Sequence, residues 1–144
     1  MSITEYVLGF AIDENRHVAM VKKRHGPTIN VGRWNGIGGK IDPTDVSPRL
    51  AMIREFYEET GITANFVHIG SFNGPDWRVF LFRTDIDCQS AILPHKNDVG
   101  ESLSWWTIPT ILLSAKQEMF AKNIPTVVAH IDGGVSQINI EIEP

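Results

Sequence analysis

The stretch Arg54-Glu55-Phe56-Tyr57-Glu58-Glu59-Thr60-Gly61 combines three closely spaced carboxylates with a terminal glycine. Residues three or four positions apart lie on one face of a helix, so Glu55, Glu58 and Glu59 are expected to share a face. Like charges at this spacing destabilise a helix by about 0.2–0.5 kcal/mol per pair. A bound cation would offset that repulsion, and Mg²⁺ prefers oxygen ligands such as carboxylates and substrate phosphates. The stretch therefore predicts a helix that contributes to a divalent metal site, with a solvated acidic face as the alternative.

The boundaries of this helix follow from residues at its two ends. Ser47 can cap the N-terminus, and Pro48 suits the first helical position, where its missing N–H costs nothing. Gly61 suits a left-handed residue after the last turn. We therefore expect a helix over residues 47–60. The apolar residues with helical spacing, expected to face the core, are Leu50, Ala51, Ile53, Phe56 and Tyr57.

The remaining pattern predicts several strands and about two further helical segments. Strands are expected at residues 6–12, 18–22, 65–70, 77–83, 103–107 and 138–142. A second helix is expected at residues 109–122, and a short one is expected from Pro125. Many strands interleaved with few helices indicate an α/β (or α+β) fold with a mixed β-sheet. No repeat or long linker interrupts the chain, so residues 1–144 are interpreted as one domain.

Length and composition exclude several classes of protein. At 144 residues, with 42% hydrophobic and 21% charged residues, the chain can bury a core without disulfides. The only cysteine, Cys88, cannot form an intrachain disulfide, which argues against a disulfide-framed secreted module. No apolar run is long enough to span a membrane, and the first residues do not resemble a signal peptide. These features predict a cytoplasmic protein.

The net charge of −4 is unevenly distributed along the chain. Residues 1–40 contain six Lys and Arg against three Asp and Glu, whereas residues 41–144 contain seven against fourteen. An acidic protein is poorly suited to general nucleic-acid binding, which depends on neutralising phosphates with basic side chains. The distribution favours a small anionic ligand that arrives with a divalent cation, and it predicts no nucleic-acid or membrane partner.

Gly38 and Gly39 precede the expected helix, and together with it they form a longer motif that can be compared with those of known families. Taken with Gly39, the residues Arg54 to Ile62 resemble the box of the Nudix hydrolases: a glycine, an acid six positions later, and Arg-Glu-x-x-Glu-Glu-x-Gly further on. The resemblance implies the family's α/β/α sandwich with a mixed β-sheet. It also implies hydrolysis of a nucleoside diphosphate linked to another group, with Mg²⁺ (or Mn²⁺ in its place) as cofactor.

One spacing departs from that box. Fourteen residues separate Gly39 from Arg54, where the family pattern has thirteen. Counted back from the helix, Val46 occupies the position of the first box glutamate, which in the family commonly pairs with the arginine. Counted forward from the glycine, the position falls on Asp45. The sequence leaves open whether Asp45 takes over as the partner of Arg54.

The resemblance assigns roles residue by residue. It implies that Glu58 and Glu59 are the main metal ligands, that Glu55 is a further ligand or the base that activates water, and that the carbonyl of Gly38 is another ligand. Family members often add an acid from a later loop. Glu101 is the first candidate for that acid and Asp98 the second, with an acidic surface loop as the alternative. The expected catalytic residues are Arg54, Glu55, Glu58, Glu59 and Glu101.

Substrate contacts are expected near the box. Lys40 and Arg33 are candidates for phosphate binding, whereas the run at residues 22–24 is more typical of a solvated strand end. An aromatic ring can stack on a nucleobase, which makes Trp34 and Trp77 candidates, although core packing is the usual role of a tryptophan. Asn35 is a candidate for reading the base through hydrogen bonds.

Together these features predict a Mg²⁺-dependent pyrophosphohydrolase that converts nucleoside triphosphates, including oxidised deoxynucleoside triphosphates, to the monophosphate and pyrophosphate. One alternative is hydrolysis of ADP-ribose, NADH or a dinucleoside polyphosphate. Another is a nucleotide-sensing module with weakened catalysis. The expected partner is a small-molecule nucleotide, and the expected state is a monomer or homodimer.

Overall fold

The computed structural model describes residues 2–24, 30–87, 92, 95–96, 100–114, 117–133 and 137–141. Two compact units divide the chain. The first comprises Met1–Phe10, Ile37–Thr84 and Ser136–Pro144, and the second comprises Ala11–Gly36 and Asp85–Val135. The long strands β1 (Thr4–Asp13) and β6 (Trp77–Ile86) each pass from one unit into the other and are neighbours in the sheet. The interpretation of residues 1–144 as one domain stays a prediction.

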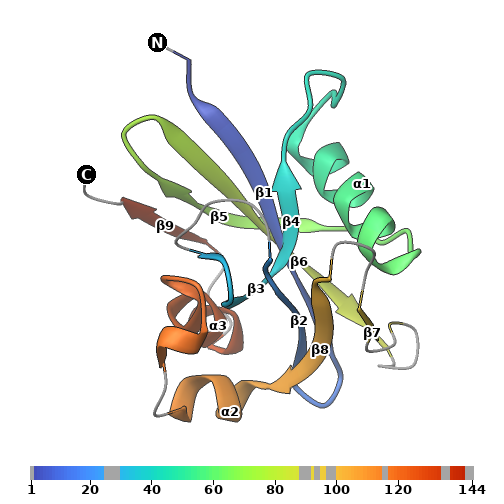
Figure 1. The fold of residues 1–144 in the computed structure, drawn as a ribbon, viewed down its shortest axis with the longest axis vertical. Coiled ribbons are helices and arrows are strands. Elements are labelled where there is room, and N and C mark those ends of the chain that lie inside the picture. The colour runs from blue at the N-terminus through green and yellow to red at the C-terminus, as the bar shows by residue number, and fades with distance from the viewer. Residues whose placement is uncertain are drawn as a thin grey trace. The chain divides into compact units, whose positions relative to one another are not determined.

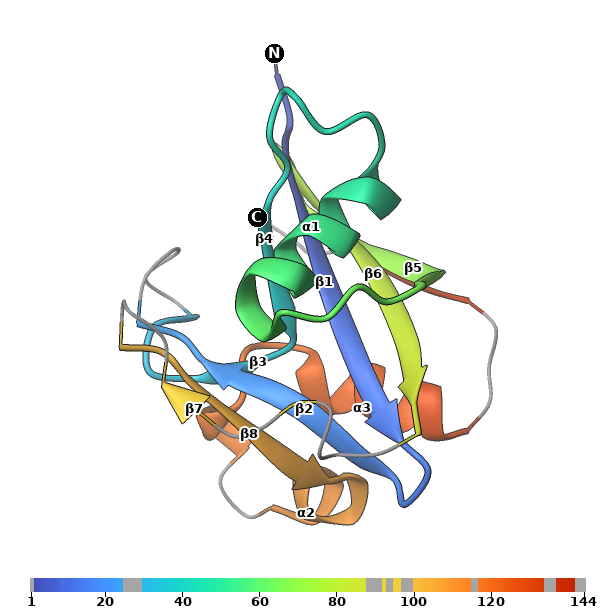
Figure 2. The same ribbon diagram turned by 90° about the vertical axis from the view of Figure 1, so that its right-hand side faces the viewer.

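The first unit is built on a mixed sheet. Strand β4 (Ile37–Lys40) pairs antiparallel with β1, and β5 (Val67–Asn73) pairs antiparallel with β6. The last strand, β9 (Ile138–Glu141), runs parallel to β5 (Figure 1). Helix α1 (Pro48–Thr60) lies against β4, as Figure 2 shows. Parallel and antiparallel pairs in one sheet, covered by a helix, confirm the predicted fold class and agree with an α/β/α sandwich.

Helix α1 has the ends that its sequence predicts. The hydroxyl of Ser47 accepts a hydrogen bond from the backbone N–H of Leu50 at 3.2 Å, and Pro48 is the first helical residue. Gly61 adopts a left-handed conformation with φ 75° and donates its N–H to the carbonyl of Tyr57 at 2.7 Å. Both devices satisfy backbone groups that a helix end leaves unpaired.

The buried face of α1 differs from the predicted apolar stripe. Leu50 is 48% exposed and Tyr57 is 55% exposed, so their assignment to the core was wrong. The fully buried residues are Ala51, Met52 and Phe56. Phe56 packs edge-on against Phe66, with ring centroids 5.2 Å apart. The helix is therefore turned about its axis so that the side next to Glu55 and Glu59 faces the sheet.

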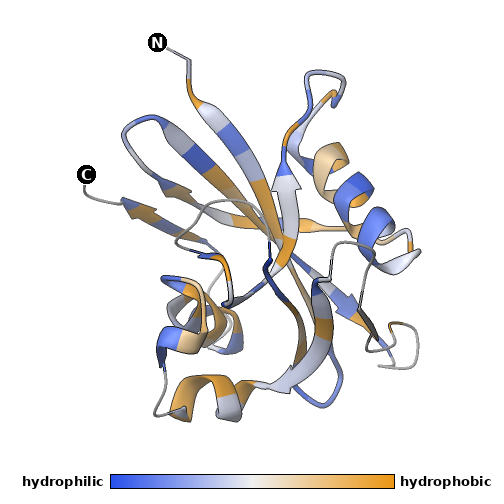
Figure 3. Ribbon diagram, viewed as in Figure 1, coloured by the Kyte–Doolittle hydropathy of each residue, from blue (hydrophilic) through white to orange (hydrophobic). Residues whose placement is uncertain are grey.

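The second unit has its own antiparallel strands. Strand β2 (His17–Lys22) pairs along its whole length with β8 (Ser102–Thr107), and at its end with the short β3 (Trp34–Asn35). Strand β7 (His95–Lys96) extends β8 on its other side. Helices α2 (Ile108–Leu113) and α3 (Ile124–Asp132) pack on each other, and Figure 3 shows how apolar both are.

The predicted helix over residues 109–122 was too long. Helix α2 ends at Leu113, and a 3₁₀ turn follows at Gln117–Met119. The chain then pairs with β3, because the N–H of Ala121 donates to the carbonyl of Trp34 at 2.8 Å. That hydrogen bond is incompatible with a continuing α-helix, whose N–H groups point along the chain. Pairing with a distant strand overrides the local helical pattern.

The other predicted elements are found with shifted ends. The strand expected at residues 65–70 begins at Val67 and continues to Asn73, and the last strand ends within the described chain at Glu141. The sequence pattern missed β3 and β4, which lie in the glycine-rich stretch around residues 34–40. None of the helices described is both long and apolar enough to cross a membrane.

Candidate active site

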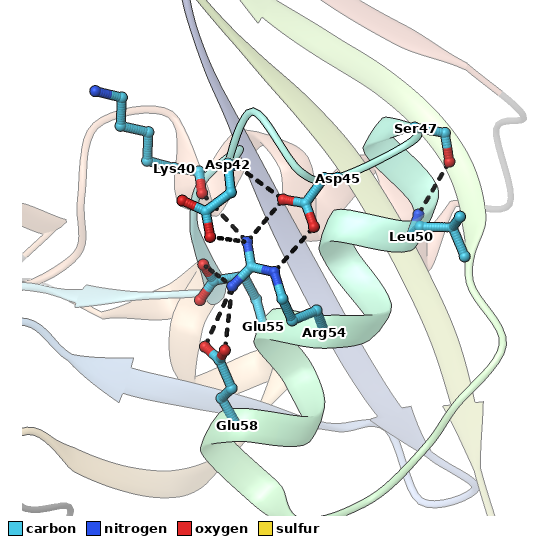
Figure 4. A network of polar contacts seen from close by, with 8 residues as sticks. All are labelled: Lys40, Asp42, Asp45, Ser47, Leu50, Arg54, Glu55 and Glu58. Atoms are coloured by element: carbon cyan, nitrogen blue, oxygen red, sulfur yellow. Dashed lines mark hydrogen bonds and ion pairs between the residues drawn. The ribbon is translucent and has the colours of Figure 1, made fainter.

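The side chains of Arg54 and Asp45 form a bidentate ion pair. Arg54 Nε donates to Asp45 Oδ1 at 3.0 Å, and Arg54 Nη2 donates to Asp45 Oδ2 at 2.9 Å (Figure 4). The carboxylate of Asp45 is 7% exposed and the guanidinium side chain of Arg54 is 28% exposed. Paired N–H donors facing both carboxylate oxygens fix orientation as well as energy. This pair holds the arginine in one position.

The loop before α1 is folded so that the side chain of Asp45 reaches Arg54 on the helix. The backbone N–H of Asp45 donates to the carbonyl of Asp42 at 2.9 Å, and the N–H of Asp42 donates back to Asp45 Oδ2 at 2.8 Å. The loop therefore folds on the carboxylate itself. Val46, at the position where the helix-based alignment expects an acid, is 88% exposed. The open question from the sequence is thus answered: the loop accommodates its additional residue, and Asp45 is the partner of Arg54.

The opposite edge of the Arg54 guanidinium contacts the carboxylates of α1. Nη1 lies 3.1 Å from Glu55 Oε1 and 3.2 Å from Glu58 Oε1 (Figure 4). A weaker contact of 3.5 Å joins Nη2 to the backbone carbonyl of Lys40. One arginine therefore connects the loop before the helix, the end of β4 and two of the three glutamates.

The charges of this cluster shift two pKa values in opposite directions. The hydrogen bonds from Arg54 hold the pKa of Asp45 below its ordinary value, although burial opposes the shift. The hydrogen bonds to Asp45, with further contributions from Glu55 and Glu58, raise the pKa of Arg54 well above its ordinary value. Both groups are therefore charged over the whole physiological pH range.

A glycine supports the carboxylate of Glu55. A Cβ atom at Gly39 would lie 2.7 Å from Glu55 Oε1, so only a residue without a side chain leaves room for this carboxylate against β4. The neighbouring Gly38 is equally constrained, because its Cβ would lie 1.9 Å from the carbonyl oxygen of Val7 on β1. The glycine pair thus allows close approach of β1 on one side and of Glu55 on the other.

The donor chemistry of α1 fits a hard divalent cation. Glu55, Glu58 and Glu59 offer only carboxylate oxygens, and Oε1 of Glu59 is buried. Among the described residues, however, no three Asp, Glu, His or Cys side chains converge closely enough to hold a metal ion. The positive group between Glu55 and Glu58 is instead the guanidinium of Arg54. The cation that these two carboxylates hold in this structure is therefore the guanidinium of Arg54.

Four of the residues predicted for the site belong to the second unit. Glu101 is 8% exposed and accepts a hydrogen bond from the backbone N–H of Arg24 at 3.1 Å, so it is not a solvated surface acid. Trp34 packs edge-on against Trp106, and Asn35 is buried, with Oδ1 accepting the N–H of its neighbour at 2.8 Å. Arg33 is half-buried. Asp98 lies outside the described residues.

Two further predicted residues lie in the first unit and do not join the glutamates. Trp77 covers the β5–β6 turn, since a Cβ at Gly74 would lie 2.3 Å from its indole ring. Its local contacts are those of a packing residue. The exposed side chain of Lys40 points away from Glu55 and Glu58 in Figure 4. The sequence analysis missed Asp42, whose carboxylate lies 3.7 Å from Arg54, because an acid in a turn has no distinguishing signal.

Comparison with known proteins assigns the family. The model of the NUDIX domain matches residues 4–128, and the chain therefore belongs to the NUDIX family, whose hydrolases act on nucleoside diphosphates linked to another group. The family generally uses divalent metal ions. No curated protein matches the chain.

Solved structures share the fold at low sequence identity. A MutT protein from Bacillus halodurans superimposes with a TM-score of 0.71 at 20% identity, covering 99% of this chain and 92% of that one. A MutT protein from Methanosarcina mazei Go1 gives 0.69 at 22% identity, with 92% and 95% covered. The NUDIX domain of Shewanella oneidensis NrtR, complexed with ADP ribose, gives 0.69 at 16% identity, with 93% and 89% covered. NrtR complexed with a 27mer DNA gives 0.67 at 15% identity, with 92% and 61% covered.

Proposed function

We propose that this protein is a Mg²⁺-dependent pyrophosphohydrolase that converts nucleoside triphosphates, including oxidised deoxynucleoside triphosphates, to the nucleoside monophosphate and pyrophosphate. One observation carries the proposal. Helix α1 contains all three glutamates of the Nudix box. Both carboxylate oxygens of Asp45 accept hydrogen bonds from Arg54 despite the additional residue in the loop. A chain that had lost catalysis would have no evident reason to retain a like-charged cluster and the ion pair that orders it.

The metal ligands in this proposal are the carboxylates of Glu58 and Glu59 with the backbone carbonyl of Gly38, and Glu55 is a further ligand or the base that activates water. When bound, Mg²⁺ neutralises phosphate oxygens and lowers the pKa of a coordinated water. Mn²⁺ has the same preference for oxygen ligands and is the expected substitute. Because Arg54 Nη1 contacts Glu55 and Glu58, the guanidinium and the metal would share these two carboxylates.

The chain's own residues have distinct tasks. Asp45 orients Arg54, and Arg54 in turn holds Glu55 and Glu58 on one side of the helix. Glu55 rests against Gly39 and is 19% exposed, which suits a base that takes a proton from an attacking water. Glu101 is proposed as the additional acid.

Some of the substrate contacts remain those suggested by the sequence. We propose that Arg33 binds phosphate and that Trp34 and Asn35 contact the base, whereas the packing of Trp77 against the β5–β6 turn and the direction of the Lys40 side chain argue against the roles that the sequence predicts for these two residues. The MutT and NrtR structures are too distant in sequence to decide between triphosphates and ADP-ribose. NrtR has been solved with DNA, whereas the acidic charge of this chain supports a small nucleotide as its partner, without stable nucleic-acid binding. A cytoplasmic location and a monomeric or homodimeric state stay predictions.

A turnover assay over a panel of nucleotides tests the proposal. The panel contains deoxynucleoside triphosphates, oxidised dGTP, ADP-ribose, NADH and Ap4A with Mg²⁺, and released pyrophosphate is separated from orthophosphate. Glu59→Gln is expected to lower turnover by about 10²-fold or more, whereas the exposed Glu14→Gln serves as a matched control without effect. Added EDTA is expected to abolish turnover.

Each other outcome points to a defined alternative. Preferred hydrolysis of ADP-ribose, NADH or Ap4A would replace the triphosphate proposal with the same chemistry on another substrate. No turnover on any nucleotide, with nucleotide binding retained, would overturn the enzymatic proposal in favour of a nucleotide-sensing module.

A further inference from the structure

A chain of hydrogen-bonded side chains crosses three strands of the first unit, β6, β5 and β9. Arg78 Nε on β6 donates to Asn73 Oδ1 on β5 at 2.9 Å. Asn73 Nδ2 donates to Ser71 Oγ at 2.8 Å, and Ser71 Oγ donates to Asn139 Oδ1 on β9 at 2.9 Å. We refer to these four residues as the Arg78 relay.

The strand register places the whole relay on one face of the sheet. Asn73 is paired with Arg78, and Ser71 is paired with both Phe80 and Asn139. Side chains two positions apart on a strand point to the same face, so these residues form one surface. The guanidinium carbon of Arg78 also lies 5.9 Å from the ring centroid of Phe80. The ring and Asn73 therefore fix the guanidinium from two sides.

The chemistry of arginine sets the direction of every hydrogen bond in the relay. A guanidinium only donates, so the amide oxygen of Asn73 must face Arg78 and its NH₂ must face Ser71. Ser71 Oγ then accepts from Asn73 and uses its single hydrogen to donate to Asn139. Asn139 accepts through Oδ1, which turns its own NH₂ away from the relay.

The relay therefore presents an excess of donors. Each of its side-chain oxygens, on Asn73, Ser71 and Asn139, already accepts one hydrogen bond inside the relay. The donors beyond these bonds are the two Nη atoms of Arg78, the second N–H of the Asn73 amide and the NH₂ of Asn139. Arg78 is half-buried and Asn139 is exposed. Donors fixed beside the guanidinium of Arg78 suit an anion more than a cation.

We propose that the Arg78 relay is a binding site for an oxyanion, either a carboxylate or a phosphate group. With Nε donating to Asn73, Nη1 and Nη2 form the edge that can donate two parallel hydrogen bonds to two oxygens of one ligand. The guanidinium loses little freedom on binding because Phe80 and Asn73 already orient it. The site does not depend on the glutamates or on metal.

A neighbouring acid limits the affinity. Glu141 lies two residues after Asn139 on β9 and is paired with Asn73, so it belongs to the same face. Its carboxylate is exposed and repels a second anion through solvent. Replacing it by the neutral Glu141→Gln is therefore expected to strengthen oxyanion binding, whereas the relay itself is retained.

Titration of the protein followed by NMR tests the site. The probes are inorganic phosphate and acetate, added separately at constant ionic strength, and the signals are the Nε–H of Arg78 and the side-chain NH₂ of Asn139. Both signals are expected to shift saturably with one dissociation constant. Arg78→Lys, which keeps the charge but loses the paired donors, is expected to raise that constant about tenfold. Arg49→Lys, on an exposed arginine of α1, is the matched control.

The results of the titration show which class of oxyanion binds and whether the relay is needed for binding. Saturation with one probe only would support the site and identify the class of oxyanion. Ser71→Ala, which removes the hydroxyl that connects Asn73 to Asn139, is expected to weaken binding while thermal unfolding confirms that the sheet is retained. No saturable shift with either probe, or equal shifts in Arg78→Lys, would overturn the proposal. Nucleotide turnover in Arg78→Lys is measured separately.

Discussion

The ion pair between Asp45 and Arg54 gives the sharpest test of how the helix is ordered. Asp45→Asn keeps the size of the side chain but removes its charge and one of its two acceptor oxygens. A hydrogen bond to a charged group contributes about 1.5–3 kcal/mol when buried. Arg54 keeps Glu55 and Glu58 as partners and is 28% exposed, which reduces the loss. We expect the free energy of unfolding to fall by about 1–2 kcal/mol.

The pH dependence of this effect has a definite sign. Because the folded pKa of Asp45 lies below its ordinary value of 3.8, the pair stabilises the folded state above that value. The stabilisation is lost as the pH falls through the lowered folded pKa. Denaturant unfolding at neutral pH should therefore separate the wild-type protein from Asp45→Asn, and the difference should shrink in strongly acidic buffer.

Val46→Glu is the matched control, since it places an acid at the position that the helix-based alignment favours. Its side chain is 88% exposed, so we expect a change in stability within about 0.5 kcal/mol. Turnover should fall about 10- to 100-fold in Asp45→Asn, because small displacements of catalytic groups are costly, and should stay unchanged in Val46→Glu. Unchanged stability and turnover in Asp45→Asn, or a gain of either in Val46→Glu, would refute the assignment of Asp45 as the arginine's partner.

Three further substitutions test individual contacts. Gly39→Ala should displace the carboxylate of Glu55, only 2.7 Å from the added Cβ, and lower turnover more than stability; equal turnover would contradict this. Gly70→Ala should destabilise the protein by about 3 kcal/mol or more, because φ is 149° and the Cβ would lie 1.5 Å from the carbonyl oxygen of Ile138. Hydrogen exchange should then show early opening of β9, and retained protection there would count against the prediction. Ser47→Ala should cost about 1 kcal/mol in denaturant unfolding through loss of the N-cap, with unchanged stability as the contrary result.

The sequence was most informative where local chemistry decides the structure. Ser47, Pro48 and Gly61 predict both ends of α1, because caps and fixed backbone angles act within a few residues. The alternation of apolar residues likewise located most strands. These signals need no knowledge of distant parts of the chain.

The sequence was less informative where partners come from afar. Of the predicted apolar stripe, Ala51 and Phe56 are buried as expected, whereas Leu50 and Tyr57 are exposed and Met52, which was not predicted, is buried. The choice depends on where β4 and Phe66 lie, which helical periodicity cannot reveal. The helix predicted over residues 109–122 was too long for the same reason, since its last residues include Ala121, which pairs with Trp34 of β3.

The predicted site residues show the same difference between local signals and contacts with distant parts of the chain. The three glutamates were identified from their helical spacing and Arg54 from the resemblance to the Nudix box, whereas the choice between Asp45 and Val46 required the path of the loop. The sequence did not predict the Arg78 relay. Two of its members, Ser71 and Asn139, form a hydrogen bond although they lie 68 residues apart in the sequence. Ordinary polar residues carry no signal until the register brings them together.

The passage of β1 and β6 through both compact units has a consequence for how the protein unfolds. Each unit is assembled from discontinuous pieces of chain, three in the first and two in the second. No single cut in a loop could release either unit as an intact fragment, and neither unit could be expressed alone as one continuous segment. Because melting one unit must disturb strands that the other requires, heat or denaturant should produce a single cooperative transition. The same chain order delays closure of the first unit during synthesis, since β9 emerges last.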